Sequence, residues 1–276
     1  YVPDHLVGRA APDPDARPLD VGYRARPIPY WLGRLGQEKV EIAERFARVA
    51  EERGLRADIA WSEESRIYGV RWHRFLSSCR ATLGVESGSS IVDHDGSIER
   101  AVTEYLAERP AATFAEVHDA VLAPHEGNAV INVVSPRVFE AAAFRSALIL
   151  YPGRYSGVVE PWRHYIPLEK DLSNLDDVLR SLRDTAFLRD LTGRAYGDLV
   201  GSGAYSYRRL ARQFDEGLEE RAEPRRVGHA RARVAGLRLE EVRAGRGFAL
   251  SYGYVAARRL VHRLLEARML LAAPAV

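Results

Sequence analysis

The feature that most constrains the fold of this chain is a helix with almost no polar face that leads into an apolar strand. Ser135 and Pro136 form a strong helix start, because a serine hydroxyl can cap the first turn and proline presets φ at the first helical position. Residues 138–144 are apolar on nearly every side of this helix, so we expect it to be buried. An apolar strand is expected to follow at 147–151.

Strand and helix patterns alternate along much of the chain. Strands are expected at 20–25, 56–61, 81–85, 147–151 and 163–168, and the helices between them at 38–53, 71–79, from 135 onward and from 174. This alternation predicts an α/β fold, a doubly wound parallel sheet of the Rossmann-like kind. Two helical patterns within 92–130, at 97–108 and 113–122, interrupt this alternation, and the second begins with a capping box from Thr113 to Glu116. We expect an inserted helical hairpin over the carboxyl edge of the sheet.

Three regions follow from this pattern. Residues 1–19 are proline-rich and predict a linker or wrapping arm with no core of its own. Residues 20–222 hold the predicted sheet domain, with helices at 186–200 and 205–221 near its end. Residues 223–276 are expected to form a helical extension, whose main element is a long basic amphipathic helix at 248–271.

Composition excludes several classes of protein. The net charge of +2 is too small to indicate nucleic-acid binding, and the single cysteine excludes an intrachain disulfide and a cysteine-based zinc site. No apolar run reaches about 18 residues, the length that a membrane-spanning helix needs. No secretory signal pattern opens the chain, and we expect a cytoplasmic protein. Asp93, His94 and Asp95 are adjacent in a turn and rarely could point at one ion, so no metal site is expected.

Two charges stand inside the apolar helix, and the residues alone leave two explanations open. Arg137 and Glu140 could pair with each other, although their order opposes the helix dipole and such a pair contributes only a few tenths of a kcal/mol when exposed. Alternatively, an anionic ligand could lie at the helix start. A phosphate would then use the backbone N–H groups and Arg137, and Glu140 would accept hydrogen bonds from sugar hydroxyls.

The segment from Asn132 to Leu150, with its Arg-Val-Phe-Glu-Ala run at Arg137, resembles the C-terminal donor-binding lobe of bacterial glycosyltransferases with the GT-B fold. The resemblance is to the group 1-like proteins and covers about residues 20–215. In that superfamily two glutamates stand eight residues apart. The second falls on Glu140, which the family implies binds the ribose of a nucleotide sugar. The first falls on Asn132, which departs from the pattern and puts its sugar-positioning role in doubt.

The resemblance also implies a set of donor-binding residues. The family's glycine-bearing turn corresponds to 153–157, and basic residues after the first strand would neutralise the diphosphate, with Arg24, Arg26, Arg34 and Lys39 as candidates. The donor-binding set that we predict is Asn132, Ser135, Arg137, Glu140, Gly153, Tyr155, Ser156, Gly157, Arg24 and Lys39. No catalytic residue is assigned, and no cofactor or metal is expected besides the nucleotide-sugar substrate.

The implied function is a metal-independent glycosyltransferase that moves a sugar from a nucleoside-diphosphate donor to an acceptor that the sequence does not identify. One alternative is a nucleotide-sugar-binding module without chemistry, and another is a structural lobe in which Arg137 and Glu140 only pair with each other. The chain opens on Tyr1 without methionine, and we expect a lobe cut from a longer protein. Its partner would be an N-terminal acceptor lobe, reached by helix 248–271. That helix could instead lie on an anionic membrane surface.

Overall fold

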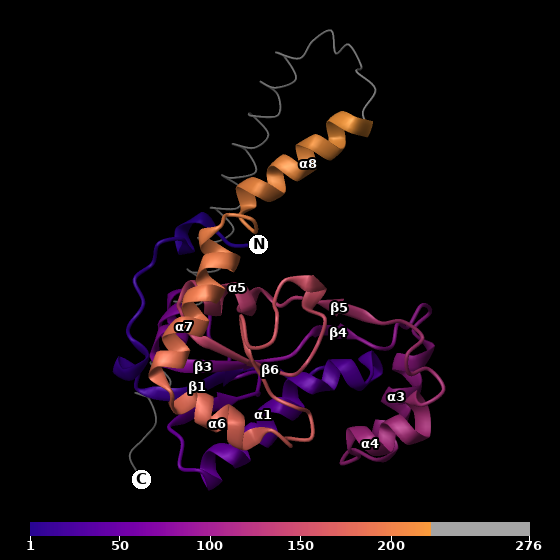
Figure 1. The fold of residues 1–276 in the computed structure, drawn as a ribbon. Coiled ribbons are helices and arrows are strands. Elements are labelled where there is room, and N and C mark those ends of the chain that lie inside the picture. Colours follow the sequence, from indigo (N-terminus) through magenta and orange to yellow (C-terminus); the bar gives the residue numbers. More distant parts are fainter. Residues whose placement is uncertain (222–276) are drawn as a thin grey trace, which may run out of the picture. The chain divides into compact units, whose positions relative to one another are not determined.

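The computed structural model describes residues 1–221 of the chain. The predicted extension 223–276, including the basic helix 248–271, lies outside the described residues. Contacts between residues divide the chain after Glu216, and the first compact unit spans Tyr1–Glu216. The secondary structure of residues 1–221 is drawn in Figure 1.

A parallel sheet of five strands forms the centre of the unit, as the alternating pattern predicted. Its strands run in the order β2-β1-β3-β6-β7, and every neighbouring pair is parallel. The strands are β1 (Leu19–Arg24), β2 (Ala57–Ala60), β3 (Cys79–Gly84), β6 (Ala147–Leu150) and β7 (Ile166–Pro167). The fold class is therefore α/β with a doubly wound, Rossmann-like sheet.

Helices cover both faces of this sheet (Figure 1). The α-helices are α1 (Arg34–Glu52), α2 (Val70–Ser78), α3 (Ser97–Glu108), α4 (Phe114–Val117), α5 (Pro136–Ala143), α6 (Leu175–Arg183), α7 (Thr185–Tyr196) and α8 (Tyr207–Arg221). Two π-helical turns, His118–Leu122 and Gly197–Gly201, continue α4 and α7. Short 3-10 helices lie at Asp4–Leu6, Pro14–Ala16, Tyr30–Leu32 and Tyr155–Gly157.

The core has two layers, one on each face of the sheet. On one face α1, α6 and the start of α7 pack on the strands, as Phe46, Leu179 and Leu188 show by their complete or nearly complete burial. On the other face α2 and α5 pack with the end of α7, through side chains such as Leu76 and Phe139. Figure 1 shows α5 above the sheet and α1 with α6 below it. Helix α5, which was predicted to be buried, thus lies between β6 on one side and α7 with its π-helical turn on the other.

Gly22 lets α2 approach the sheet closely. A Cβ atom at this position would collide with Cys79 Sγ and lie 2.7 Å from the ring of Phe75. Contacts of this length do not occur between carbon atoms, so a side chain here would push α2 away from β1.

The inserted segment contains the two predicted helical patterns and is flanked by a short antiparallel pair of strands that the sequence did not indicate. Strands β4 (Ser87–Ser89) and β5 (Ile131–Val133) pair antiparallel at the base of the insertion. Helices α3 and α4 lie beyond them, away from the central sheet (Figure 1), and share a small core around Ile91 and Val102. The predicted capping box at Thr113 is present. Asp93 and Asp95 cap the start of α3 through backbone N–H groups.

The N-terminal segment, predicted as a linker or wrapping arm, packs against the sheet domain within the first compact unit. Val2 and Leu6 are buried in the second layer, and Val2 N donates to Tyr205 O. Arg17 is 1% exposed, and its guanidinium donates to the carbonyl oxygens of Pro12, Leu76, Cys79 and Phe144. These buried contacts hold the N-terminal segment against the sheet domain, and the proline content of the segment does not reveal them.

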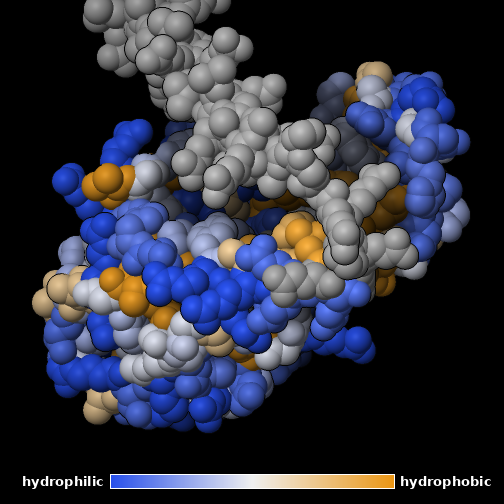
Figure 2. Space-filling model, turned by 90° about the horizontal axis from the view of Figure 1, so that it is seen from above, coloured by the Kyte–Doolittle hydropathy of each residue, from blue (hydrophilic) through white to orange (hydrophobic). Residues whose placement is uncertain are grey.

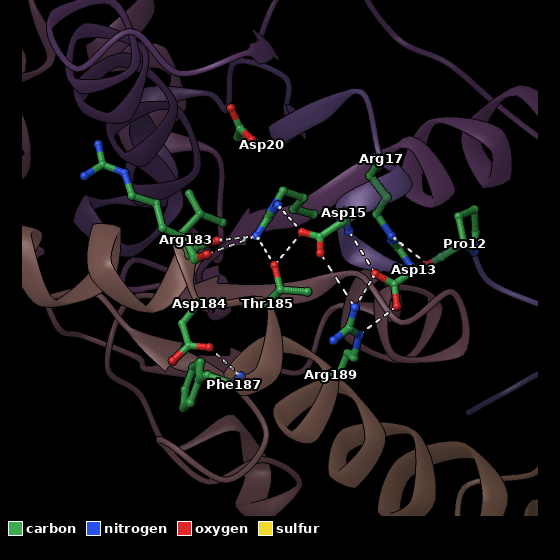
Figure 3. A network of polar contacts seen from close by, with 12 residues as sticks. Pro12, Asp13, Asp15, Arg17, Asp20, Arg183, Asp184, Thr185, Phe187 and Arg189 are labelled. Atoms are coloured by element: carbon green, nitrogen blue, oxygen red, sulfur yellow. Dashed lines mark hydrogen bonds and ion pairs between the residues drawn. The ribbon is translucent and has the colours of Figure 1, made fainter.

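Ion pairs and hydrogen bonds also hold the same segment against α7 (Figure 3). Arg189 pairs with Asp13, and Arg80 bonds both Asp15 and Thr185. The Arg189–Asp13 pair is about half exposed and contributes little by itself, whereas the Arg80 side chain is only 11% exposed.

The visible surface in Figure 2 is mostly hydrophilic, with apolar residues gathered in a few patches. Within residues 1–221, no helix combines the length and the apolar character that crossing a bilayer would require.

Candidate functional site

The sheet order places a crevice between β1 and β3. Strands β2 and β3 lie on opposite sides of β1 in the sheet. The connection that follows β1 and the connection that follows β3 therefore run over opposite faces of the sheet. In open α/β sheets, ligands bind at such a reversal point, outside the carboxyl ends of the strands. The end of β1 and the end of β3 are here Arg24 and Gly84.

A cleft of about 550 Å³ lies at this position, which is within the usual range for small-molecule sites. Six segments line it: the end of β1 and its loop, α1, the end of β3, the residues before and within α2, the start of α5, and β6. Its lining includes Tyr23, Arg24, Arg26, Lys39, Arg66, Tyr68, Trp72, His73, Ser135, Arg137 and Glu140. The predicted residues Arg24, Lys39, Ser135, Arg137 and Glu140 thus come together here.

Positive charge gathers on one side of the cleft. Lys39 is half-buried, and burial together with the nearby charges of Arg137 and Arg26 holds the pKa of its amine below the ordinary value. Within residues 1–221 no carboxylate forms an ion pair with Lys39, Arg26 or Arg137. Three cations that repel one another and have no anionic partner favour the binding of an anion.

Arg24 lines the same cleft but differs from these three cations. Its Nη2 donates to Asp58 Oδ2 at 2.8 Å, and its guanidinium lies over the Phe75 ring at 4.5 Å. Within residues 1–221, the Nε atom of Arg24, the hydroxyl of Tyr23 and the Nε of Arg137 are buried without a hydrogen-bond partner.

Arg137 and Glu140 do not pair with each other. Glu140 Oε2 accepts a hydrogen bond from the indole Nε1 of Trp72 at 2.8 Å. The Arg137 guanidinium lies over the ring of Tyr23 at 4.6 Å and donates its Nη2 to the carbonyl oxygen of Arg24. Both charged side chains line the cleft, so the explanation by a mutual ion pair does not hold.

The backbone at the start of α5 offers less to an anion than the sequence suggested. Pro136 has no N–H group, Arg137 N donates to the Ser135 side chain, and Val138 N donates to the Ser135 carbonyl. The first N–H groups are therefore occupied within the cap itself. Attraction of an anion in this cleft must come from the side chains and the helix dipole.

The other predicted residues lie outside the cleft lining. Asn132 is on β5, where its Nδ2 donates to Glu86 Oε2 at 2.8 Å. Tyr155 is buried, and its hydroxyl donates to Tyr151 O. Ser156 and Gly157 form the turn after it with φ of 52° and 70°. The donor-binding roles of these residues remain predictions.

Gly153 belongs to the same neighbourhood, because a Cβ there would lie 2.7 Å from Glu86 Oε2. Glu86 is 7% exposed and also accepts from Tyr155 N at 2.6 Å. Glu86 follows the end of β3, and its hydrogen bonds link the β4–β5 strand pair to the turn at 153–157. Glu86 was not among the predicted site residues, and the one local signal that marks it is its place after a buried strand.

Trp72, within the predicted helix 71–79, is a second cleft residue that was not predicted. Its ring stacks on Phe75, with centroids 5.7 Å apart, but its indole N–H points to Glu140. No local signal in α2 reveals a contact with a helix 68 residues further along the chain.

Fold and cleft together define a doubly wound α/β domain with a cationic crevice at its strand-order reversal. No family model and no curated protein matches the sequence. Among solved structures, the chain is similar to TarM, with a TM-score of 0.40 and 12% identity over 75% of this chain and 36% of TarM. A mutant of S. aureus TarM in complex with fondaparinux, α-GlcNAc-glycerol and UDP gives a TM-score of 0.39 and 12% identity, over 75% of this chain and 37% of that one.

This chain thus spans little more than a third of the length of these structures. A similarity of this size says nothing about what the cleft binds.

Proposed function

We propose that this cleft binds the nucleoside-diphosphate part of a nucleotide sugar and that the chain is the donor-binding lobe of a glycosyltransferase. The observation that carries the proposal is the convergence of Arg26, Lys39 and Arg137, none of which has a carboxylate partner in residues 1–221. A diphosphate brings the negative charge that this group lacks. Glu140, on the same wall, has one carboxylate oxygen engaged by Trp72 and can accept ribose hydroxyls with the other.

The chemical role of these residues would be to stabilise the leaving group. When the bond between sugar and diphosphate breaks, negative charge develops on the diphosphate. Preorganised cations lower the energy of that charge in the transition state more than in the ground state. Arg137 is preorganised, because two aromatic rings and the Arg24 carbonyl fix its guanidinium. An acceptor and its general base would come from outside the cleft residues described.

Calorimetric titration of the full chain with UDP and GDP tests the binding step. We expect binding of at least one of them, weakened as salt concentration rises, and much weaker binding of the corresponding nucleoside, because the cations contact the diphosphate. Arg137→Gln should reduce the affinity at least about tenfold, since charge-assisted hydrogen bonds contribute about 1.5–3 kcal/mol each. Arg109→Gln is a matched control, because Arg109 lies at the end of α3, outside the cleft lining. Failure of every nucleoside diphosphate to bind would refute the proposal.

The alternative is a module that binds nucleotide sugars without transferring the sugar. Donor hydrolysis or transfer by the longest available form of the protein, compared with Glu140→Gln, separates the two. Activity that depends on Glu140 supports the transferase, and tight binding without turnover supports the binding module.

A further inference from the structure

Trp72 of α2 contacts both charged side chains at the start of α5. Its indole Nε1 donates to Glu140 Oε2 at 2.8 Å, and the face of its ring lies 5.5 Å from Arg137 Cζ. The ring is itself fixed, because it stacks on Phe75 at an interplanar angle of 27°. One neutral side chain from a different helix therefore holds a cation and an anion at the same time.

These two ions would otherwise be expected to pair. Residues three apart on a helix are neighbours, and opposite charges at that spacing attract each other. A mutual pair would neutralise Arg137 and use the acceptor oxygens of Glu140. In the structure the carboxylate is satisfied by a neutral N–H group, and the guanidinium by aromatic faces and a backbone carbonyl. Both ions keep their charge toward the cleft.

The chemistry of the indole ring suits this role. Tryptophan has one N–H donor and no acceptor, so it can hold a carboxylate without competing for the hydrogen atoms of ligand hydroxyls. The electron-rich face of the same ring attracts a guanidinium. A histidine or lysine at this position would bring a charge of its own into the cleft.

We propose that Trp72 is a positioning residue that keeps Arg137 and Glu140 apart, so that one remains available to an anion and the other to sugar hydroxyls. The effect of Trp72 on ligand binding rests on the proposed function. Its effect on the geometry of the two ions does not depend on any ligand.

The geometric test is a crystal structure of the Trp72→Phe variant without ligand. Phenylalanine keeps an aromatic face for Arg137 but removes the hydrogen bond to Glu140. We expect the released carboxylate to turn to Arg137, with a nitrogen–oxygen distance within about 4 Å, the usual limit for an ion pair. Side chains that stay apart in this variant would overturn the proposal, whether or not the protein binds nucleotides.

The binding test compares UDP and GDP with their 2′-deoxy counterparts. Wild-type protein is expected to prefer the ribonucleotide by about tenfold or more, because a hydroxyl bonded to a carboxylate is a charge-assisted hydrogen bond. In Trp72→Phe this preference should fall to about twofold or less. Trp162→Phe serves as the control for loss of an indole, because Trp162 is 45% exposed, packs on Phe187 and lies outside the cleft lining.

A second pair of variants separates positioning from general damage to the fold. If Trp72 acts through Glu140, then adding Trp72→Phe to Glu140→Gln should change the ribose preference no further. If Trp72 has only a structural role, Trp72→Phe should lower the affinity for all nucleotides both in the wild-type protein and in Glu140→Gln, and that result would refute the inference. A wild-type protein that binds no nucleotide would refute the proposed function, and the crystal structures would still decide the role of Trp72.

Discussion

Replacing the buried Arg17 by methionine should destabilise the whole unit. Burial lowers the pKa of this guanidinium to about 10, so it remains charged at neutral pH although it is 1% exposed. Its partners are all backbone carbonyl oxygens, and it joins the N-terminal segment to the end of α2 and the end of α5. Methionine has a similar reach but no donor.

The expected cost follows from the carbonyl groups that would be left without a donor. Cys79 O would keep the Ser146 hydroxyl, which donates to it at 3.1 Å. The carbonyls of Pro12 and Phe144 accept from Arg17 at 2.9 and 2.8 Å and have no second donor within residues 1–221. The Phe144 carbonyl is buried and costs about 1–3 kcal/mol when it is left without a donor, whereas Pro12 is exposed and its carbonyl can bond to water, so we expect a net loss of about 2 kcal/mol. In a domain of this size that loss corresponds to a Tm lower by about 4–8 °C.

Thermal and urea denaturation of the full chain, followed by far-UV circular dichroism, measures this change. Arg189→Met is the matched control. It removes an arginine that binds the same segment through Asp13 on the surface, beside Arg17 in Figure 3, and its Tm should stay close to that of the wild type. Equal effects of the two substitutions would show that burial of the guanidinium does not decide its contribution.

Three further predictions concern titration and burial. Binding of UDP or GDP should weaken as pH rises through the lowered pKa of Lys39, with proton uptake on binding in that pH range that Lys39→Met abolishes. Calorimetry in buffers of different ionisation enthalpy measures this uptake. The same lowered pKa means that the unfolded chain holds this proton at a pH where the folded chain has lost it, so this group adds stability as pH rises from the folded pKa toward the ordinary value of 10.5. Burial raises the pKa of the Cys79 thiol to about 11, so a disulfide reagent at pH 8 should label it only when the protein unfolds; rapid labelling of native protein would contradict its burial. Glu86→Ala leaves the N–H of Tyr155 and the amide of Asn132 without their acceptor and should cost about 1–3 kcal/mol in urea denaturation, whereas an unchanged midpoint would show that water replaces the carboxylate.

Local patterns predicted most of the fold, because apolar periodicity and capping residues are local signals. Helix α3 has the bounds that the sequence pattern predicted, 97–108. Strand β6 ends at Leu150, one residue before the end of the predicted strand 147–151. The pair β4–β5 was missed because its short strands contain serine, glycine and asparagine and join segments some 40 residues apart. Strand β7 is shorter than expected, since only Ile166 and Pro167 pair with β6.

The site was predictable to the extent that its residues are neighbours in the sequence. Arg137 and Glu140 stand in one helical turn, and their charges in an apolar segment were conspicuous. Lys39 was a candidate by its place after the first strand, but the sequence could not show that, among residues 1–221, Arg24 has a carboxylate partner and Lys39 has none. The contact of Trp72 with both ions depends on how α2 is rotated against α5, which tertiary packing alone determines.

The pairing of Val2 with Ser206 has a practical consequence. The first residues of the unit lie beside the segment that leads into α8, so residues 2 and 206 are neighbours in space. Such a unit can be circularly permuted: a short glycine-rich connection could join residue 206 to residue 1, and new ends could be opened in the turn at 123–128. Domains with adjacent ends also tolerate insertion into a surface loop of another protein without strain on the host.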